Sequence, residues 1–203
     1  MSTNACVHVI DDDDAVRFSL RLLLETEGLK VADYVSADAF LMSYSSSEPG
    51  CIVSDIQMPG LSGLELQETL GTRGIHLPII MLTGHADVPS AVRSLKAGAV
   101  DFIEKPFAPQ RLLDQVRAAL AMDSQRHEEL AQRARLEALL AVLTPREREV
   151  LDCVAVGHSN KVVAIDLGIS ERTVELHRSR GMKKLKVRTV ADLVRLLPEQ
   201  TGC

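Results

Sequence analysis

The chain has 203 residues, 46% hydrophobic and 25% charged, which is ordinary for a globular protein of one large domain or two small ones. No run approaches the roughly 18–20 apolar residues that cross a bilayer, and no basic segment followed by an apolar one marks an export signal. The four cysteines form no Cys-x-x-Cys pair, which argues against a zinc site or a disulfide framework and suits a reducing cytosol. We therefore expect a cytoplasmic protein with no membrane partner.

The net charge of −5 is unevenly distributed along the chain. Residues 1–123 hold nine Lys or Arg against 17 Asp or Glu, whereas residues 124–203 hold 14 against 11. Residues 172–188 hold seven basic residues and one acid, Glu175. This split predicts two domains, the second with an anionic partner, although a basic helix face is more often simply solvated.

The first 120 residues alternate short apolar runs with segments whose apolar residues recur at helical spacing. Apolar runs separated by helices predict a parallel sheet covered on two sides. Five βα units fit this length, so we expect an α/β fold with a doubly wound five-stranded parallel sheet. The expected strands are Val7–Ile10, Lys30–Tyr34, Cys51–Ser54, Ile79–Leu82 and Val100–Ile103.

The remainder of the chain shows only helical patterns. Residues 118–143 are rich in Ala, Leu, Gln, Glu and Arg and predict a helical linker. Four short helices are then expected: one that Thr144 caps, one from Ser159 to about Leu167, one that Ser170 caps, and one from Thr189 to Leu197. Only Gly168-Ile169 separates the second from the third, which is typical of a helix-turn-helix in an all-α DNA-binding domain. The expected boundaries are 1–121, 122–142 and 143–203.

Polar side chains follow the expected strands at their carboxyl ends. They are Asp11 and Asp12, Asp55, Thr83, and Lys105. In a doubly wound sheet these ends meet at one edge, where ligands bind. Clustered carboxylates repel one another unless a cation neutralises them, and Mg²⁺ suits an all-oxygen site. A carboxylate beside Mg²⁺, a lysine and a hydroxyl can attack a phosphoryl donor.

These residues resemble the response-regulator receiver domain (flavodoxin-like), and more closely its FixJ-like subgroup. The matching stretches are Val9-Ile-Asp-Asp-Asp, Ser54-Asp-Ile-Gln-Met-Pro-Gly, Thr83-Gly-His-Ala-Asp-Val-Pro and Phe102-Ile-Glu-Lys-Pro-Phe. The resemblance implies that a partner sensor histidine kinase phosphorylates Asp55. It further implies that Asp12, Asp55 and the Gln57 carbonyl bind Mg²⁺, that Asp11 acts through water, and that Lys105 and Thr83 contact the phosphoryl group.

The same resemblance implies further features of the receiver. The Lys105–Pro106 peptide is expected to be cis. Phe102 stands at the switch position, where many receivers carry Tyr; it is either a switch that gains only packing or simply a core residue. Phosphorylation is expected to expose a dimerisation face that includes residues 88–97 and 100–103. The four acids at 11–14 are expected to divide, with Asp13 at the pocket rim and Asp14 at the start of the first helix.

Residues 144–197 resemble the LuxR/FixJ-type helix-turn-helix, through Thr144-Pro-Arg-Glu-Arg-Glu and Gly168-Ile-Ser-Glu-Arg-Thr-Val-Glu-Leu-His. The third helix would enter the major groove of promoter DNA, with RNA polymerase a further candidate partner. Glu175, Leu176 and Ser179 are expected at base edges, although Glu175 would oppose binding if it faced a phosphate. Arg178 could contact bases or phosphates, and Gly181 has no evident role. Phosphate contacts are expected from Asn160, Lys161, Thr173, Arg180 and Lys184.

Three functions fit these motifs. The first is a transcription regulator that phosphorylation activates, and it is not an enzyme. The second is a Mg²⁺-dependent phosphatase or phosphotransferase. The sequence argues against it, because the position two residues after Asp55 holds Gln57 and not a second acid. The third is a DNA-binding protein whose receiver is not phosphorylated, against which stands the complete set of pocket residues.

Overall fold

The computed structural model describes residues 5–45, 49–84 and 101–197. The chain divides into two compact units, Met1–Glu128 and Glu129–Cys203. The domain boundaries expected after residues 121 and 142 stay predictions. Across the described ranges, no helix has the length and apolar character that a membrane span requires. Cys6 and Cys51 are free and buried.

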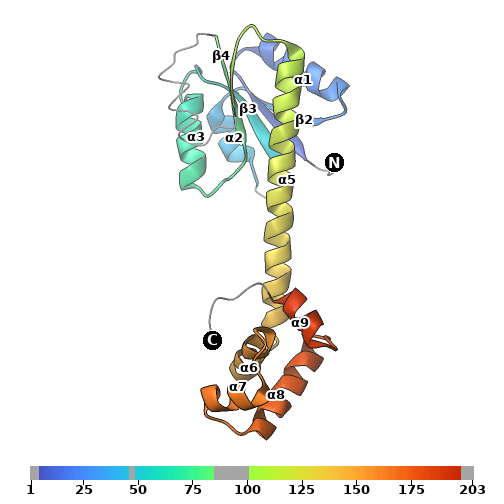
Figure 1. Ribbon diagram of the computed structural model, residues 1–203. Coiled ribbons are helices and arrows are strands. Elements are labelled where there is room, and N and C mark those ends of the chain that lie inside the picture. The colour runs from blue at the N-terminus through green and yellow to red at the C-terminus, as the bar shows by residue number, and fades with distance from the viewer. Residues whose placement is uncertain (1–4, 46–48, 85–100, 198–203) are drawn as a thin grey trace. The chain divides into compact units, whose positions relative to one another are not determined.

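The first unit contains the predicted parallel sheet, in the order β2-β1-β3-β4-β5 (Figure 1). The order reverses direction between β1 and β3, which places a switch point there, as in doubly wound folds. The predicted α/β fold class is thus confirmed. The strands are β1 (Cys6–Ile10), β2 (Lys30–Tyr34), β3 (Gly50–Asp55), β4 (Ile79–Thr83) and β5 (Asp101–Glu104).

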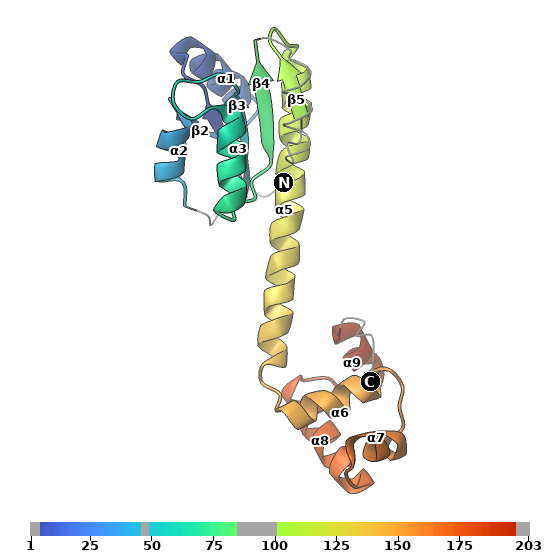
Figure 2. The same cartoon turned by 90° about the vertical axis from the view of Figure 1, so that its left-hand side faces the viewer.

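Both faces of the sheet are covered, because the central strands are apolar at every other position on each side. Val7 and Val53 pack in one core cluster with residues of α1 (Asp14–Thr26) and α5 (Pro109–Leu140). Ile52 and Met81 pack on the other face, with α2 (Ala37–Ser43) and α3 (Gly63–Thr72). Figure 2 shows α3 and α5 on opposite sides of β4.

Helix α5 is held to the amino-terminal edge of the sheet by two polar contacts. Asp123, 3% exposed, accepts a hydrogen bond from the Gly50 amide at 2.9 Å. Arg126 donates from Nη1 to the His76 carbonyl at 3.0 Å. Gly50 is required there because a Cβ would lie 2.5 Å from the Cys6 carbonyl oxygen. The segment expected as a linker is helical as far as Leu140, and its first turns contact the sheet.

The second unit is built from four helices among the described residues: α6 (Pro145–Ala155), α7 (Asn160–Leu167), α8 (Glu171–Lys184) and α9 (Val190–Leu196). The two predicted N-caps, Thr144 and Ser170, are confirmed, and Ser159 and Thr189 cap the other two helices; each side chain accepts a hydrogen bond from a backbone amide of the first turn. Gly168 ends α7 in the left-handed conformation, with φ 64°, which glycine adopts without strain. The turn between α7 and α8 is therefore the tight one that the sequence predicts.

Gly181, which the sequence left without a role, lies where α8 crosses α6. It is buried, and a Cβ at this position would lie 2.7 Å from Leu151 Cδ1 and 3.2 Å from its Cγ. Leu151 is itself fully buried, so it has little room to move. The glycine thus permits a close helix approach, which offsets its cost of about 1 kcal/mol in helix propensity.

We predict that Gly181→Ala destabilises the second unit by about 1 kcal/mol, because overpacking of about 1–3 kcal/mol outweighs the gain in helix propensity. Leu151→Val removes the methyl carbon that the new Cβ meets. In a double-mutant cycle measured by urea unfolding, the double variant should therefore lose less stability than the sum of the two single variants. Additive losses, or a more stable Gly181→Ala variant, would contradict this explanation.

Candidate functional site

Three of the predicted residues meet at the carboxyl edge of the sheet. Lys105, which follows β5, places Nζ 2.8 Å from Asp11 Oδ2 and 2.8 Å from Asp55 Oδ1. The two carboxylate side chains are 3% and 12% exposed, and the lysine is 25% exposed. We call Asp11, Asp55 and Lys105, together with the exposed Asp12 next in sequence, the carboxylate pocket. It brings together residues 94 positions apart in sequence because β1, β3 and β5 are parallel and end at one edge.

The lysine is held as a cation. Burial alone would lower the pKa of Lys105, but hydrogen bonds and the negative charges of Asp11 and Asp55 raise the pKa above its ordinary value. Three carboxylates against one ammonium still leave the pocket with two uncompensated formal negative charges. Such a pocket attracts a cation or a group that a cation accompanies.

The backbone around Asp55 fixes where its carboxylate lies. Asp55 Oδ2 accepts a hydrogen bond from the backbone amide of Gln57 at 2.9 Å, while Asp55 Oδ1 faces Lys105. Gly63 packs so closely that a Cβ would overlap the Asp55 carbonyl oxygen. Thr83, 3% exposed, is joined to the lysine through the main chain, because its carbonyl accepts from the Lys105 amide at 2.6 Å. The Lys105–Pro106 peptide is cis, as expected.

The acidic run 11–14 divides between the pocket and the start of α1. Asp13 is the N-cap of α1, and its Oδ1 accepts from the Ala15 and Val16 amides at 2.8 and 3.3 Å. Its carboxylate therefore caps the helix, a role that was not predicted, while the expected position at the pocket rim stays a prediction. Asp14 is the first residue of α1, as expected, and forms an ion pair with Arg17.

Arg17 is a pocket neighbour that sequence reasoning missed. Its side chain is 11% exposed, and Nη1 donates to the Asp11 carbonyl at 2.7 Å. Asp11 Oδ1 in turn accepts from the Asp13 amide at 3.0 Å. These bonds fasten the turn that carries Asp12. No signal in the sequence points to an arginine that bonds a backbone carbonyl six residues earlier.

The donor set of the pocket fits a hard divalent cation in its chemistry, because every donor is an oxygen and two negative charges are uncompensated. Asp12 is exposed and has no hydrogen bond or ion pair that would compete for its carboxylate within the described ranges. Within those ranges, no group of three or more His, Cys, Asp or Glu side chains is gathered closely enough to hold a metal ion. Lys105 joins Asp11 to Asp55 in the structure.

The switch candidate Phe102 lies in β5 with its ring half-buried against the core cluster that α2 and α3 cover. This position agrees with either expectation for Phe102, a packing switch or a core residue. The expected dimerisation segment 88–97 lies outside the described residues.

The predicted DNA-contacting residues lie on α7 and α8. Four of them, Asn160, Glu175, Arg178 and Ser179, line a groove of about 770 Å³. Its other lining residues are Met182, Lys183, Lys186, Val187 and Arg188, and we call the whole set the recognition groove. Leu176 is 46% exposed but does not line the groove, and neither do Lys161, Thr173, Arg180 or Lys184.

Lys184, an expected phosphate contact, has an internal partner. Its Nζ donates to Glu147 Oε2 at 2.6 Å, and the same carboxylate accepts from the Thr144 amide at 2.9 Å in a capping box. The Glu147 side chain is 4% exposed. Lys184 therefore ties the end of α8 to the start of α6. The sequence could not predict this pair, because its partners are 37 residues apart.

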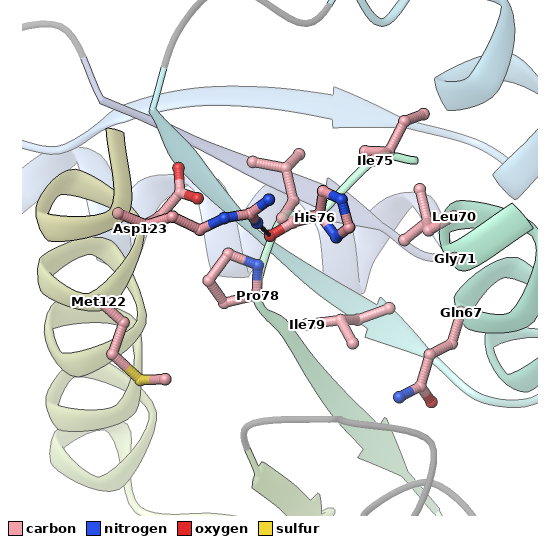
Figure 3. Close-up of a pocket in the computed structure, with 11 residues that line it drawn as sticks. Gln67, Leu70, Gly71, Ile75, His76, Pro78, Ile79, Met122 and Asp123 are labelled. Atoms are coloured by element: carbon pink, nitrogen blue, oxygen red, sulfur yellow. Dashed lines mark hydrogen bonds between the residues drawn. The ribbon is translucent and has the colours of Figure 1, made fainter. Parts of the chain in front are cut away.

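A separate cavity of about 340 Å³ lies at the amino-terminal end of β4, the end opposite to the carboxylate pocket (Figure 3). Leu70 and Gly71 of α3 line it from one side, and Met122 and Asp123 of α5 line it from the other. None of the predicted site residues lines this cavity.

Family models match most of the chain. Residues 7–117 match the response regulator receiver domain, and residues 141–197 match the bacterial regulatory proteins of the luxR family. The chain belongs to the response regulator family. It is a FixJ-like transcription regulator with a receiver domain and a LuxR-type DNA-binding domain, and not an enzyme.

Individual relatives agree with this membership. The response regulator is 48% identical to the transcriptional regulatory protein FixJ of Azorhizobium caulinodans, over 94% of this chain and 90% of that one. It is 46% identical to nodulation protein W of Bradyrhizobium diazoefficiens, over 96% and 86% of the two chains.

Solved structures of full-length response regulators are also similar to it. The response regulator StyR matches with a TM-score of 0.86 at 42% identity, over 95% of this chain and 98% of that one. Full-length FixJ from B. japonicum matches with a TM-score of 0.59 at 41% identity, over 94% of both chains. In this family the receiver domain implies a histidine kinase partner, and the LuxR-type domain implies DNA binding.

The Glu147–Lys184 pair makes a prediction about pH. The hydrogen bond from Lys184, with that from the Thr144 backbone, lowers the pKa of Glu147 from 4.5 to about 2. A lowered folded-state pKa stabilises the fold above about pH 4.5, and this contribution is lost as pH falls toward 2. The difference in melting temperature between wild type and Glu147→Gln should thus be largest near neutral pH and shrink below about pH 4.5.

The matched control is Glu149→Gln, since Glu149 is on the same helix in an exposed pair with Arg146. It should change the melting temperature little at any pH. A difference between wild type and Glu147→Gln that stays constant from pH 7 to pH 3 would contradict the ion pair.

Proposed function

We propose that this response regulator is activated by transfer of a phosphoryl group from a phosphohistidine of a sensor histidine kinase to Asp55. The observation that carries the proposal is the Lys105 ammonium, which lies 2.8 Å from carboxylate oxygens of both Asp11 and Asp55. A lysine in this position can neutralise the negative charge of the Asp55 carboxylate before the transfer and that of a phosphoryl oxygen after it. The protein would act in the cytoplasm, with the domain boundaries expected from its sequence.

The proposed step is a substitution at phosphorus. A carboxylate oxygen of Asp55 forms the new P–O bond while the P–N bond to the kinase imidazole breaks, and the imidazole leaves with the bonding electron pair. The product is an acyl phosphate at Asp55. Lys105 would neutralise a phosphoryl oxygen, and the Thr83 hydroxyl would donate to another, so that the chain acts mainly through position and charge.

Mg²⁺ is the proposed cofactor. Asp12, Asp55 and the Gln57 carbonyl would hold it, with Asp11 acting through water. The bound ion would supply positive charge to the transferring phosphoryl oxygens. Support comes from the all-oxygen donor set and from the two negative charges that Lys105 leaves uncompensated.

An apolar surface beside the pocket supports a protein as the phosphoryl donor. Lys105, Pro106 and Phe107 line a depression of about 520 Å³ with residues of α1. Ala15 and Ser19 of α1 line the depression. Phe18 and Leu22 follow them at helical spacing on the same face of α1, and their side chains are 59% and 55% exposed. Exposed apolar side chains of this size next to a reactive carboxylate suit a protein partner better than a small phosphate ester.

The output is proposed to be regulated binding to promoter DNA. Phosphorylation would promote a homodimer, with Phe102 responding to the phosphoryl group by a change in packing. RNA polymerase remains a candidate partner. The proposed DNA-contacting residues are Asn160, Lys161, Thr173, Glu175, Leu176, Arg178, Ser179, Arg180 and Lys184, of which Lys184 would first have to leave Glu147.

The first test is coupling between Asp55 and DNA. Acetyl phosphate with Mg²⁺ should raise the affinity of the wild-type chain for an inverted-repeat promoter duplex, measured by fluorescence anisotropy, and should leave the affinity of Asp55→Ala unchanged. The affinity should also fall as salt increases, because counterions are released from DNA. Equal affinities for treated wild type and Asp55→Ala would contradict the proposal.

The second test concerns the metal. Asp12→Ala should abolish Mg²⁺ binding measured by isothermal titration calorimetry, because it removes an exposed carboxylate that has no other partner among the described residues. Asp14→Ala is the matched control, since Asp14 pairs with Arg17 at the start of α1 and should leave Mg²⁺ affinity nearly intact. Equal loss in the two variants would refute the assignment of Asp12.

A further inference from the structure

We infer that Arg178 is a guanine-reading residue and that Asn160 positions it, rather than contacting a phosphate. This role rests on the proposed DNA binding, and it means that the recognition groove selects a guanine. It replaces the open choice for Arg178 between base and phosphate, and it changes the role of Asn160.

The guanidinium of Arg178 is held in place. Its Nη1 donates to Asn160 Oδ1 at 3.1 Å, and both residues are half-buried. Asn160 is the first residue of α7, so the bond spans the two helices of the helix-turn-helix. An arginine fixed in this way has lost rotamer freedom before DNA binds, which favours a directed contact over a loose one.

The groove-facing residues of α8 form one stripe. Glu175, Arg178, Ser179 and Met182 are spaced as i, i+3, i+4 and i+7, and all four line the recognition groove. This stripe, and not the face with Leu176 and Arg180, is what α8 presents to a ligand in the groove.

Positive charge for the DNA backbone is available elsewhere in the groove. Lys183, Lys186 and Arg188 line it and are exposed, as phosphate-contacting cations usually are. Arg178 is therefore not required for phosphate binding. With one N–H committed to Asn160, the guanidinium still carries four N–H donors, enough for the two-point contact with guanine O6 and N7.

Glu175 supports this assignment. It stands three residues before Arg178 on the same stripe, a spacing at which Glu and Arg commonly pair. Arg178 bonds Asn160 instead, and Glu175 is exposed with no ion pair to any residue that the structure describes. An unpaired acid in a basic groove repels phosphates and is tolerated where it faces a base amino group, such as cytosine N4. The side chains of this stripe thus contact the bases of the DNA and not only its phosphate backbone.

The experiment uses the full-length chain with Mg²⁺ and beryllofluoride. A pool of DNA duplexes randomised over 20 base pairs is put through selection with wild type, Arg178→Lys, Asn160→Ala and Lys183→Ala. The affinity of each variant for the wild-type consensus duplex is then measured by anisotropy at several salt concentrations. Thermal melting of each variant reports whether the fold is kept.

The expected result is a fixed guanine in the wild-type consensus that Arg178→Lys and Asn160→Ala no longer select. Replacing this guanine should weaken wild-type binding about 10- to 100-fold and weaken the binding of these two variants little. Their dependence on salt should match wild type. Lys183→Ala should keep the guanine and reduce the salt slope by about 1.

Two results would overturn the inference alone. One is an unchanged consensus for Arg178→Lys and Asn160→Ala with an affinity that is weakened equally for every duplex sequence, which means a phosphate contact. The other is an unchanged consensus with a lowered melting temperature, which means a structural bond between α7 and α8. If wild type enriches no sequence, the proposed sequence-specific DNA binding fails together with the inference.

Discussion

The Lys105 ammonium between the carboxylates of Asp11 and Asp55 is the interaction on which the receiver's chemistry depends. Two nearly buried carboxylates repel one another when both are ionised, and Lys105 offsets this repulsion with two bonds of 2.8 Å. Its position requires that β1, β3 and β5 end at one edge of a parallel sheet, and that Gly63 lets α3 approach Asp55. The same lysine is the group that would meet a phosphoryl oxygen when Asp55 becomes an acyl phosphate and its carboxylate loses its own charge.

The second unit uses part of its basic charge internally. Lys184 is bound to Glu147, and Arg178 is bound to Asn160, so two of the seven basic residues at 172–188 hold helices together. Gly181 lets α8 pack closely against Leu151 of α6, and this contact fixes how near α8 lies to α6. Helix α8 is therefore anchored at its middle and its end. Its selectivity can then come from a few oriented side chains, while exposed cations such as Lys183 and Lys186 provide general affinity.

Much of the fold could be predicted because the signals are local. The strands follow from apolar runs, and the helix starts from Thr144, Ser159, Ser170 and Thr189 with their spacing to the first turn. The meeting of Asp11, Asp55 and Lys105 follows from the rule that parallel strands end at one edge. The partners of Lys184, Arg17 and Gly181 could not be predicted, since each depends on which residues the tertiary packing brings opposite. The N-cap role of Asp13 was missed because any of four consecutive acids can cap the helix, and only the backbone geometry selects one.

Locating the phosphoryl group tests the central claim most directly. The chain would be incubated with acetyl phosphate and Mg²⁺, the acyl phosphate reduced with borohydride, and the modified residue found by peptide mass spectrometry, with Asp55→Asn and Lys105→Ala in parallel. We expect one labile phosphoryl group per chain, on Asp55, which is absent from Asp55→Asn and from samples treated with a chelator, and which forms more slowly in Lys105→Ala. A phosphoryl group on another residue, or equal labelling of Asp55 without Mg²⁺ and without Lys105, would contradict it.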